Sequence, residues 1–247
     1  AISVRGPELR RSLRTVTVAW MFGIIWLSCI GGSRINIFGR MLGFQDRHFG
    51  IMAALPYAAT LGQLFAVVLI ERTGLRKYQF LECALVHRAL WLVVAAIPLL
   101  LPLPSLWAVW ATLGVFAFSN FLGALSAPAW MTWMGDLIPR RIRGRYFATR
   151  ARYAEMTKIP LILSLGLLLD ALTRTDPATG VPLPMTATEQ PVLLGAICSI
   201  FALAAVLGSL DILHFHRVRE FIPSTSDEPR RPVVDIHIEP PPDPSLT

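Results

Sequence analysis

Six long apolar segments dominate this sequence and restrict its fold more than any other feature. As α-helices rising ~1.5 Å per residue, they are long enough to cross the ~30 Å hydrocarbon core of a bilayer. They fall at about 17–39, 48–70, 79–101, 105–135, 147–171 and 192–214. A backbone in lipid must satisfy its own hydrogen bonds, which a helix does within one segment. We therefore expect an all-α membrane protein with six transmembrane helices and the lipid bilayer as its first partner.

The composition supports this class, because apolar residues make up 54% of the chain and charged residues only 16%. A net charge of +7 would suggest nucleic acid in a soluble protein. Here the basic residues occupy short loops between apolar segments, so we expect no nucleic-acid partner. The segment at 147–171 is the weakest candidate span, because its first half is polar. It crosses only if protein or water shields that half.

The distribution of basic residues predicts the orientation. The stretch 135–150 places a cluster of arginines between two apolar segments, and alternating the sides along the chain puts seventeen Lys and Arg residues on one side against four on the other. Loops rich in Lys and Arg stay in the cytoplasm. We therefore place both termini in the cytoplasm of a protein of the cell (inner) membrane. The run that begins near Thr17 is too long for a signal peptide, so we expect a retained first span.

Three regions follow from this topology: a cytoplasmic N-terminal segment at 1–16, a six-helix transmembrane domain at 17–219, and a tail at 220–247. The tail is rich in Pro and charge, so we expect a disordered cytoplasmic tail or linker. The segment 173–191 carries several prolines and is expected to be an irregular extracytoplasmic loop. The three cysteines lie in different apolar segments without metal-ligand spacing. We therefore expect no metal and no cofactor.

Two of the cytoplasmic loops carry recognisable motifs. The first joins the second and third segments, and its motif residues are Glu71, Arg72, Gly74, Arg76 and Lys77. The second follows the fourth segment and contains Asp136, Pro139, Arg143, Gly144 and Arg145. Together with the six-segment arrangement, these motifs resemble the N-terminal six-helix half of a major facilitator superfamily (MFS) transporter over roughly residues 13–219.

The resemblance implies one half of an MFS fold and secondary active transport of a small solute by alternating access. The binding site of that fold lies between two six-helix halves, so a second half is expected on the same longer chain, on a separate chain or in a second copy. The loop charges would form a cytoplasmic gating cluster. We expect Asp136 to pair with the basic residues of 72–77, and Glu71 to pair with Arg143 or Arg145. Alternatively, these arginines only set topology and contact lipid phosphates.

Charged and polar residues inside the segments are the candidates for a substrate or coupling cavity. Lys158 lies roughly 16 Å into the fifth segment, with Glu155 on the same helix face. They either line a cavity or form a buried structural ion pair. Arg34 either faces a cavity or snorkels to the interface. Gln63 and Asn120 either bind solute or hydrogen-bond between helices.

Other polar residues receive structural interpretations. Glu82, His87 and Arg88 of the third segment are expected to be structural or snorkelling. Asp211, with His214 and His216, is expected to be solvated at a helix end rather than to bind metal. Trp130 and Trp133 are expected to anchor the interface.

Two function classes compete with transport. The chain could be a non-transporting membrane scaffold or a subunit of a larger complex. An intramembrane enzyme is not expected, because the sequence has no HExxH, no GxSxG and no paired intramembrane aspartates. Solute uptake into vesicles would distinguish a transporter from a scaffold.

Overall fold

The computed structural model describes residues 7–173 and 186–218, and these form eight α-helices and no strand. The helices are α1 (Pro7–Ile30), α2 (Ser33–Leu42), α3 (Asp46–Ala59), α4 (Gly62–Thr73), α5 (Arg76–Leu100), α6 (Leu106–Leu137), α7 (Arg140–Leu172) and α8 (Glu189–Phe215). The all-helical prediction is confirmed. The predicted tail at 220–247 and most of the predicted irregular loop lie outside the described residues. The helix α1 begins at Pro7, inside the predicted cytoplasmic segment at 1–16, and the boundary at residue 16 stays a prediction.

Five helical segments of the described chain are long and apolar enough to cross a membrane. They are Glu8–Ile30, Asp46–Thr73, Arg76–Leu100, Leu106–Leu137 and Glu189–Phe215. The predicted fifth span lies within α7, a continuous helix of 33 residues that is not among the five. The polar residues in its first half lower its hydropathy. The outer faces of the bundle carry many exposed apolar side chains, such as Leu99 and Leu167, which suits contact with lipid.

The first predicted span, 17–39, is wrong in its extent, because the helix breaks after Ile30. Gly32 adopts φ 71°, a left-handed conformation that glycine allows without strain. Arg34 then turns back over the end of α1, donating from Nε to the carbonyl of Cys29 (3.1 Å) and from Nη2 to that of Ser28 (2.6 Å). The buried guanidinium therefore caps carbonyls that the helix end leaves without intrahelical donors.

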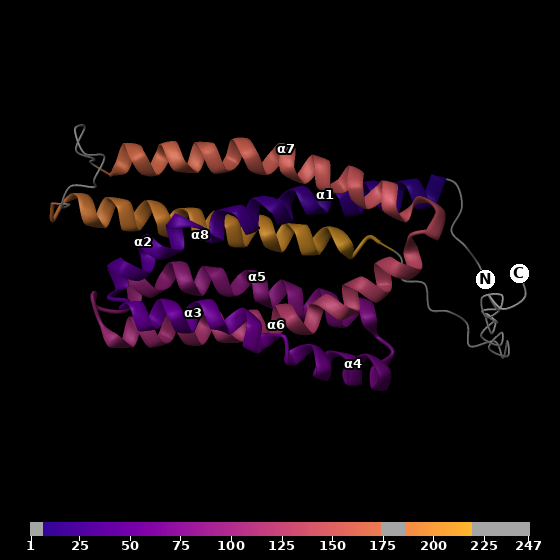
Figure 1. The fold of residues 1–247 in the computed structure, drawn as a ribbon, viewed down its shortest axis with the longest axis horizontal. Helices are drawn as coiled ribbons and strands as arrows, with labels where there is room; N and C mark the ends of the chain where they lie inside the picture. Colours follow the sequence, from indigo (N-terminus) through magenta and orange to yellow (C-terminus); the bar gives the residue numbers. More distant parts are fainter. Residues whose placement is uncertain (1–6, 174–185, 219–247) are drawn as a thin grey trace, which may run out of the picture.

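The long helices run back and forth between two ends of an elongated bundle (Figure 1). One end gathers the α4–α5 junction, the α6–α7 junction and the end of α8. This basic end carries most of the described loop arginines, whereas α3, α6 and α8 begin at the opposite end.

The main packing contacts follow one order across the bundle. The segment α3–α4 packs on α6, α6 on α5, α5 on α8, α8 on α1, and α1 on α7. Exchanging α1 with α6, α3–α4 with α7, and α5 with α8 gives the same set of packing contacts. The exchanged helices run in opposite directions (Figure 1). The bundle therefore has the pairing of two inverted three-helix repeats.

Two separate apolar clusters fill the interior. The cluster near the basic end contains Phe80, Trp133 and Phe215, and the cluster toward the opposite end contains Phe38, Trp91 and Phe201. Trp133 is only 1% exposed. The expectation that it anchors the membrane interface is therefore wrong, since it lies in the core of the first cluster.

Candidate functional site

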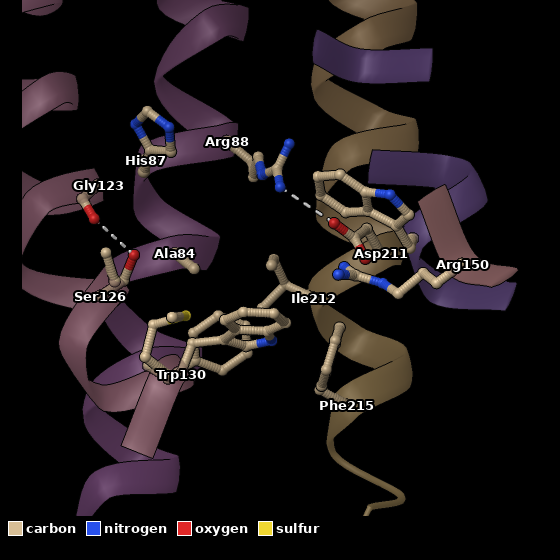
Figure 2. A pocket seen from close by; sticks show the side chains of 14 residues that line it. Ala84, His87, Arg88, Gly123, Ser126, Trp130, Arg150, Asp211, Ile212 and Phe215 are labelled. Atoms are coloured by element: carbon tan, nitrogen blue, oxygen red, sulfur yellow. Dashed lines mark hydrogen bonds and ion pairs between the residues drawn. The ribbon is translucent and has the colours of Figure 1, made fainter. Parts of the chain in front are cut away.

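A pocket of about 380 Å³ lies beside the apolar cluster near the basic end, which contributes Phe80, Ile212 and Phe215 to its lining (Figure 2). Side chains from α1, α5, α6, α7 and α8 line it. The lining residues are Trp20, Phe80, Ala84, His87, Arg88, Gly123, Ser126, Ala127, Trp130, Met131, Arg150, Asp211, Ile212 and Phe215. Trp130 lies seven residues before the end of α6, which places it about 10 Å from the basic end of the bundle. The pocket therefore occupies the half of the bundle nearer that end.

A buried ion pair joins α5 to α8 at this pocket. Arg88 donates from Nη2 to Oδ2 of Asp211 at 3.0 Å, and the two residues are only 8% and 2% exposed. Nε and Nη1 of Arg88 and Oδ1 of Asp211 have no hydrogen-bond partner among the described residues. Buried polar atoms are almost always paired, because desolvation without a partner costs free energy. The two Arg88 nitrogens can therefore still donate, and Asp211 Oδ1 can still accept, a hydrogen bond with a polar ligand or water.

Trp26 of α1 fixes the Arg88 guanidinium from the other side. The guanidinium carbon lies 3.7 Å from the centroid of the indole ring, within the range of a cation–π interaction. The Trp26 ring also contacts His87 and Trp91 edge to face. Arg88 is therefore oriented by a carboxylate and an aromatic face together, which leaves the remaining N–H groups unpaired.

Two glycines allow the helices to approach closely enough to form this pair. A Cβ atom on Gly23 of α1 would collide with the Asp211 carboxylate, with Cγ at 3.0 Å. A Cβ on Gly208 of α8 would lie 2.7 Å from Cδ1 of Trp26 and 3.1 Å from Cδ of Arg88. A side chain at either position would separate the groups that orient Arg88.

A second guanidinium reaches the pocket from α7. Arg150 lies over the rings of Trp20 and Trp130, with centroid distances of 4.2 and 5.1 Å. Its Nε has no hydrogen-bond partner in the described part of the chain. Figure 2 shows Arg88 and Arg150 reaching toward Asp211 from opposite sides. Two guanidinium groups and one carboxylate therefore meet at the pocket.

His87 and Ser119 complete the polar surroundings on the side of α6. His87 Nδ1 lies 2.7 Å from the Ser119 hydroxyl, which also donates to the His87 carbonyl at 3.2 Å. These contacts connect α5 to α6. They hold the imidazole at the pocket wall next to Arg88.

The loop charges form a second cluster at the basic end. Arg76 Nη1 lies 2.6 Å from Asp136 Oδ2. Lys77 donates from Nζ to the carbonyls of His216 (3.0 Å) and Val218 (2.7 Å). The expected pairing of Asp136 with the loop at 72–77 is confirmed. The cluster connects the start of α5 to the ends of α6 and α8.

The other predicted pair of this cluster does not form. Glu71 makes no ion pair with Arg143 or Arg145 in the described structure. Arg143 instead donates to the carbonyls of Gly135 and Ile138 at the end of α6, where orphan carbonyls need donors. Glu71, Arg72, Gly144 and Arg145 are exposed, and Gly74 ends α4 with φ 68°.

None of the five cavity residues predicted from the sequence lines the pocket. Lys158 pairs with Glu155 at 2.9 Å on a part of α7 where both side chains are exposed, at 37% and 55%. Arg34 caps α1. Asn120 donates to the Phe116 carbonyl of its own helix at 2.8 Å, and Gln63 is exposed near the start of α4. The buried structural form of the Lys158–Glu155 pair is therefore not observed.

The residues that do meet at the pocket received other interpretations from the sequence. Arg88 was expected to snorkel or to be structural, Asp211 to be solvated, and Arg150 to set topology. Asp211 is instead 2% exposed and paired with Arg88. The sequence did contain a signal for this pair. Arg88 and Asp211 are charges of opposite sign inside two apolar segments, and each needs a partner away from lipid. Comparisons with known protein families, curated proteins and solved structures find no match to this chain.

Proposed function

We propose that this chain is one six-helix half of an MFS-type secondary transporter that moves a small solute by alternating access. The observation that carries the proposal is the inverted pairing of α1, α3–α4 and α5 with α6, α7 and α8. Inverted three-helix repeats within each six-helix half are the construction of that fold. A scaffold that only presents its outer faces would not need this internal symmetry.

The location of the pocket supports the same function. It lies between α5 and α8, which exchange with one another under the repeat symmetry, and it is bordered by α1 and α6, which also exchange. In the proposed fold the substrate site lies between two six-helix halves, so the pocket would be the part of that site that this half contributes. Buried charges with unpaired atoms at this position suit a ligand that enters and leaves.

The membrane arrangement completes the proposal. The chain lies in the cell membrane with six spans, both termini in the cytoplasm, and α7 crossing with its polar half turned toward protein and water. A second six-helix half forms the other wall of the cavity. The Arg76–Asp136 pair and its neighbours then act as the cytoplasmic gating cluster, because they persist only while the helix ends stay close.

Uptake of radiolabelled benzoate, phenylalanine and glucose into proteoliposomes tests the transport function. We expect flux of at least one solute that Arg88→Gln abolishes and Arg40→Gln leaves unchanged, since Arg40 pairs with Asp46 away from the pocket. Absence of flux with all three, in liposomes that contain the folded protein assembled with its second half, would favour the alternative of a non-transporting scaffold.

A further inference from the structure

We propose that the pocket binds a small organic anion, whose charged group contacts Arg88 and Arg150 while its apolar part lies among the surrounding rings. Calling this ligand the transported solute rests on the proposed function. The binding itself rests on the pocket alone. The charge balance, the unpaired donors and the aromatic walls each lead to this chemical class.

The balance of formal charge favours an anion. Two guanidinium groups face the pocket, and among its lining residues only Asp211 carries a carboxylate. One positive charge therefore remains without a counter-charge in the pocket. A single oxyanion would neutralise it, whereas a cation would add to the repulsion between the two arginines.

Three buried N–H groups of the two guanidiniums have no partner among the described residues, and an oxyanion supplies the acceptors that they lack. Arg88 uses Nη2 for Asp211 and keeps Nε and Nη1 unpaired, and Arg150 keeps Nε unpaired. Nε and Nη1 of one guanidinium point in different directions, so each can donate a separate hydrogen bond to a carboxylate or phosphate oxygen. Trp26 covers the face of Arg88, and Trp20 and Trp130 cover that of Arg150. These rings orient the planes without using the N–H groups.

The size and walls of the pocket indicate the rest of the ligand. A volume of about 380 Å³ lies at the low end of the range for small-molecule sites. Phe80, Trp130, Ile212 and Phe215 provide an apolar surface beside the charges. A flat monocarboxylate the size of benzoate combines these properties.

Asp211 is placed to compete with such a ligand. Its Oδ2 occupies one donor of Arg88, and its charge lies beside both guanidinium groups. Replacing it by asparagine removes the negative charge while keeping the shape. We therefore expect Asp211→Asn to bind the anion about tenfold more tightly or better.

Calorimetric titration of the purified full chain with benzoate tests this inference, with benzamide as the uncharged isostere and benzylammonium as the cation. We expect benzoate to bind about tenfold or more tightly than either analogue. Arg88→Gln and Arg150→Gln should each weaken benzoate binding by a similar factor. Arg40→Gln is the matched control and should bind benzoate as the unaltered protein does.

A folding control separates lost binding from lost structure. Arg88→Gln leaves Asp211 without its partner, so the double variant Arg88→Gln/Asp211→Asn is measured as well, because its neutral pair keeps the fold. It should recover most of the stability that Arg88→Gln loses, and it should bind benzoate more weakly than Asp211→Asn alone. Benzoate binding no tighter than benzamide binding, or unchanged in both folded arginine variants, would overturn the inference.

An anionic lipid headgroup carries the same chemistry as a soluble anion. Native mass spectrometry of the purified protein distinguishes the two sources. Phospholipid retained by the unaltered protein but lost from both arginine variants would overturn the assignment to a soluble solute. Benzoate binding without benzoate uptake would contradict only transport of this ligand, whereas uptake of glucose or phenylalanine without benzoate binding would contradict only the anion site.

Discussion

Arg88 and Asp211 place two charges in the interior of a bundle that otherwise buries mainly apolar side chains. The desolvation of each charge is offset only while the other is present, so the loss of one costs more than the loss of both. The exposed pair of Arg40 and Asp46 differs, because water solvates whichever charge remains. The two pairs therefore allow a direct comparison within one chain.

We predict that Arg88→Gln lowers the free energy of unfolding by about 3–5 kcal/mol, because it strands the buried carboxylate. Arg88→Gln/Asp211→Asn should recover most of that loss. Arg40→Gln should cost less than about 1 kcal/mol. Thermal unfolding in detergent measures all three. Equal destabilisation by the single and double variants would show that the pair does not couple α5 to α8.

Gly23 offers a second test, because it determines how closely α1 approaches Asp211. We predict that Gly23→Ala lowers the free energy of unfolding by about 1–3 kcal/mol, since the new methyl group displaces the carboxylate from Arg88. Gly166→Ala is the matched control within a helix. Its Cβ would meet nothing within 4 Å, and alanine favours helix over glycine. A melting temperature for Gly23→Ala at or above that of Gly166→Ala would contradict this role.

The sequence alone predicts some residue contacts, but it does not predict those that depend on how the helices pack. Asp136 and Arg76 lie at helix ends that the predicted topology puts on the same side of the membrane, so charge and predicted topology were enough to pair them. Arg88 and Asp211 lie 123 positions apart on helices whose packing depends on glycines and on the whole bundle. Arg34 could not be assigned because its role depends on a helix break after Ile30 that periodicity does not reveal.

At the scale of the helices, the basic end is held by contacts of two kinds. Asp136 and Arg76 form an ion pair whose side chains are 42% and 18% exposed, so water and salt weaken it. Lys77 instead donates to two carbonyls beyond the end of α8 and lies 5.8 Å from the ring centroid of Trp133. It satisfies acceptors that the helix end leaves without backbone donors.

We therefore predict that Lys77→Met destabilises this end more than Asp136→Asn does. Hydrogen exchange should become faster in the last turn of α8 for Lys77→Met, and only slightly faster in the last turn of α6 for Asp136→Asn. The expected cost of Asp136→Asn is below about 1 kcal/mol. Faster exchange in α8 for Asp136→Asn than for Lys77→Met would contradict this prediction, because the ion pair would then stabilise this end more than the Lys77 contacts do.

The helices differ in how well the hydropathy pattern of the sequence predicted them. Four apolar segments, at 48–70, 79–101, 105–135 and 192–214, predicted helical stretches to within several residues, since an uninterrupted apolar run in lipid leaves few other backbone conformations. The fifth segment was expected to be the weakest span because of its polar first half, and α7 is the helix that hydropathy does not select. Its Glu155–Lys158 pair is exposed, so the low hydropathy reflects an unpacked polar face rather than a buried structural pair.

At the scale of the whole molecule, the inverted pairing could not be predicted from sequence similarity. The sequence shows no strong repeat between the first and second three-helix units. Packing symmetry depends on which helices touch, and many apolar sequences satisfy the same contacts. The pocket beside the apolar cluster near the basic end follows from this packing, so its residues could be identified only once the helices were placed.

The number of membrane crossings can be tested because the loops alternate sides. If Thr73 at the end of α4 is cytoplasmic, α5 leads outward and α6 leads back. Ala187, just before α8, is then extracytoplasmic only if α7 also crosses. Six spans therefore place Thr73 and Ala187 on opposite sides, whereas a non-crossing α7 places them on the same side.

We predict the six-span outcome, measured with a membrane-impermeant maleimide on intact cells. The background variant replaces Cys29, Cys83 and Cys198 by alanine, and single cysteines are introduced as Thr73→Cys and Ala187→Cys, both at exposed positions. Ala187→Cys should label in intact cells, and Thr73→Cys only after permeabilisation, because the arginine-rich loops remain cytoplasmic. Protection of both cysteines in intact cells would mean that α7 does not cross. Labelling of Thr73→Cys in intact cells, with Ala187→Cys protected, would invert the orientation and place the Arg76–Asp136 pair outside the cell.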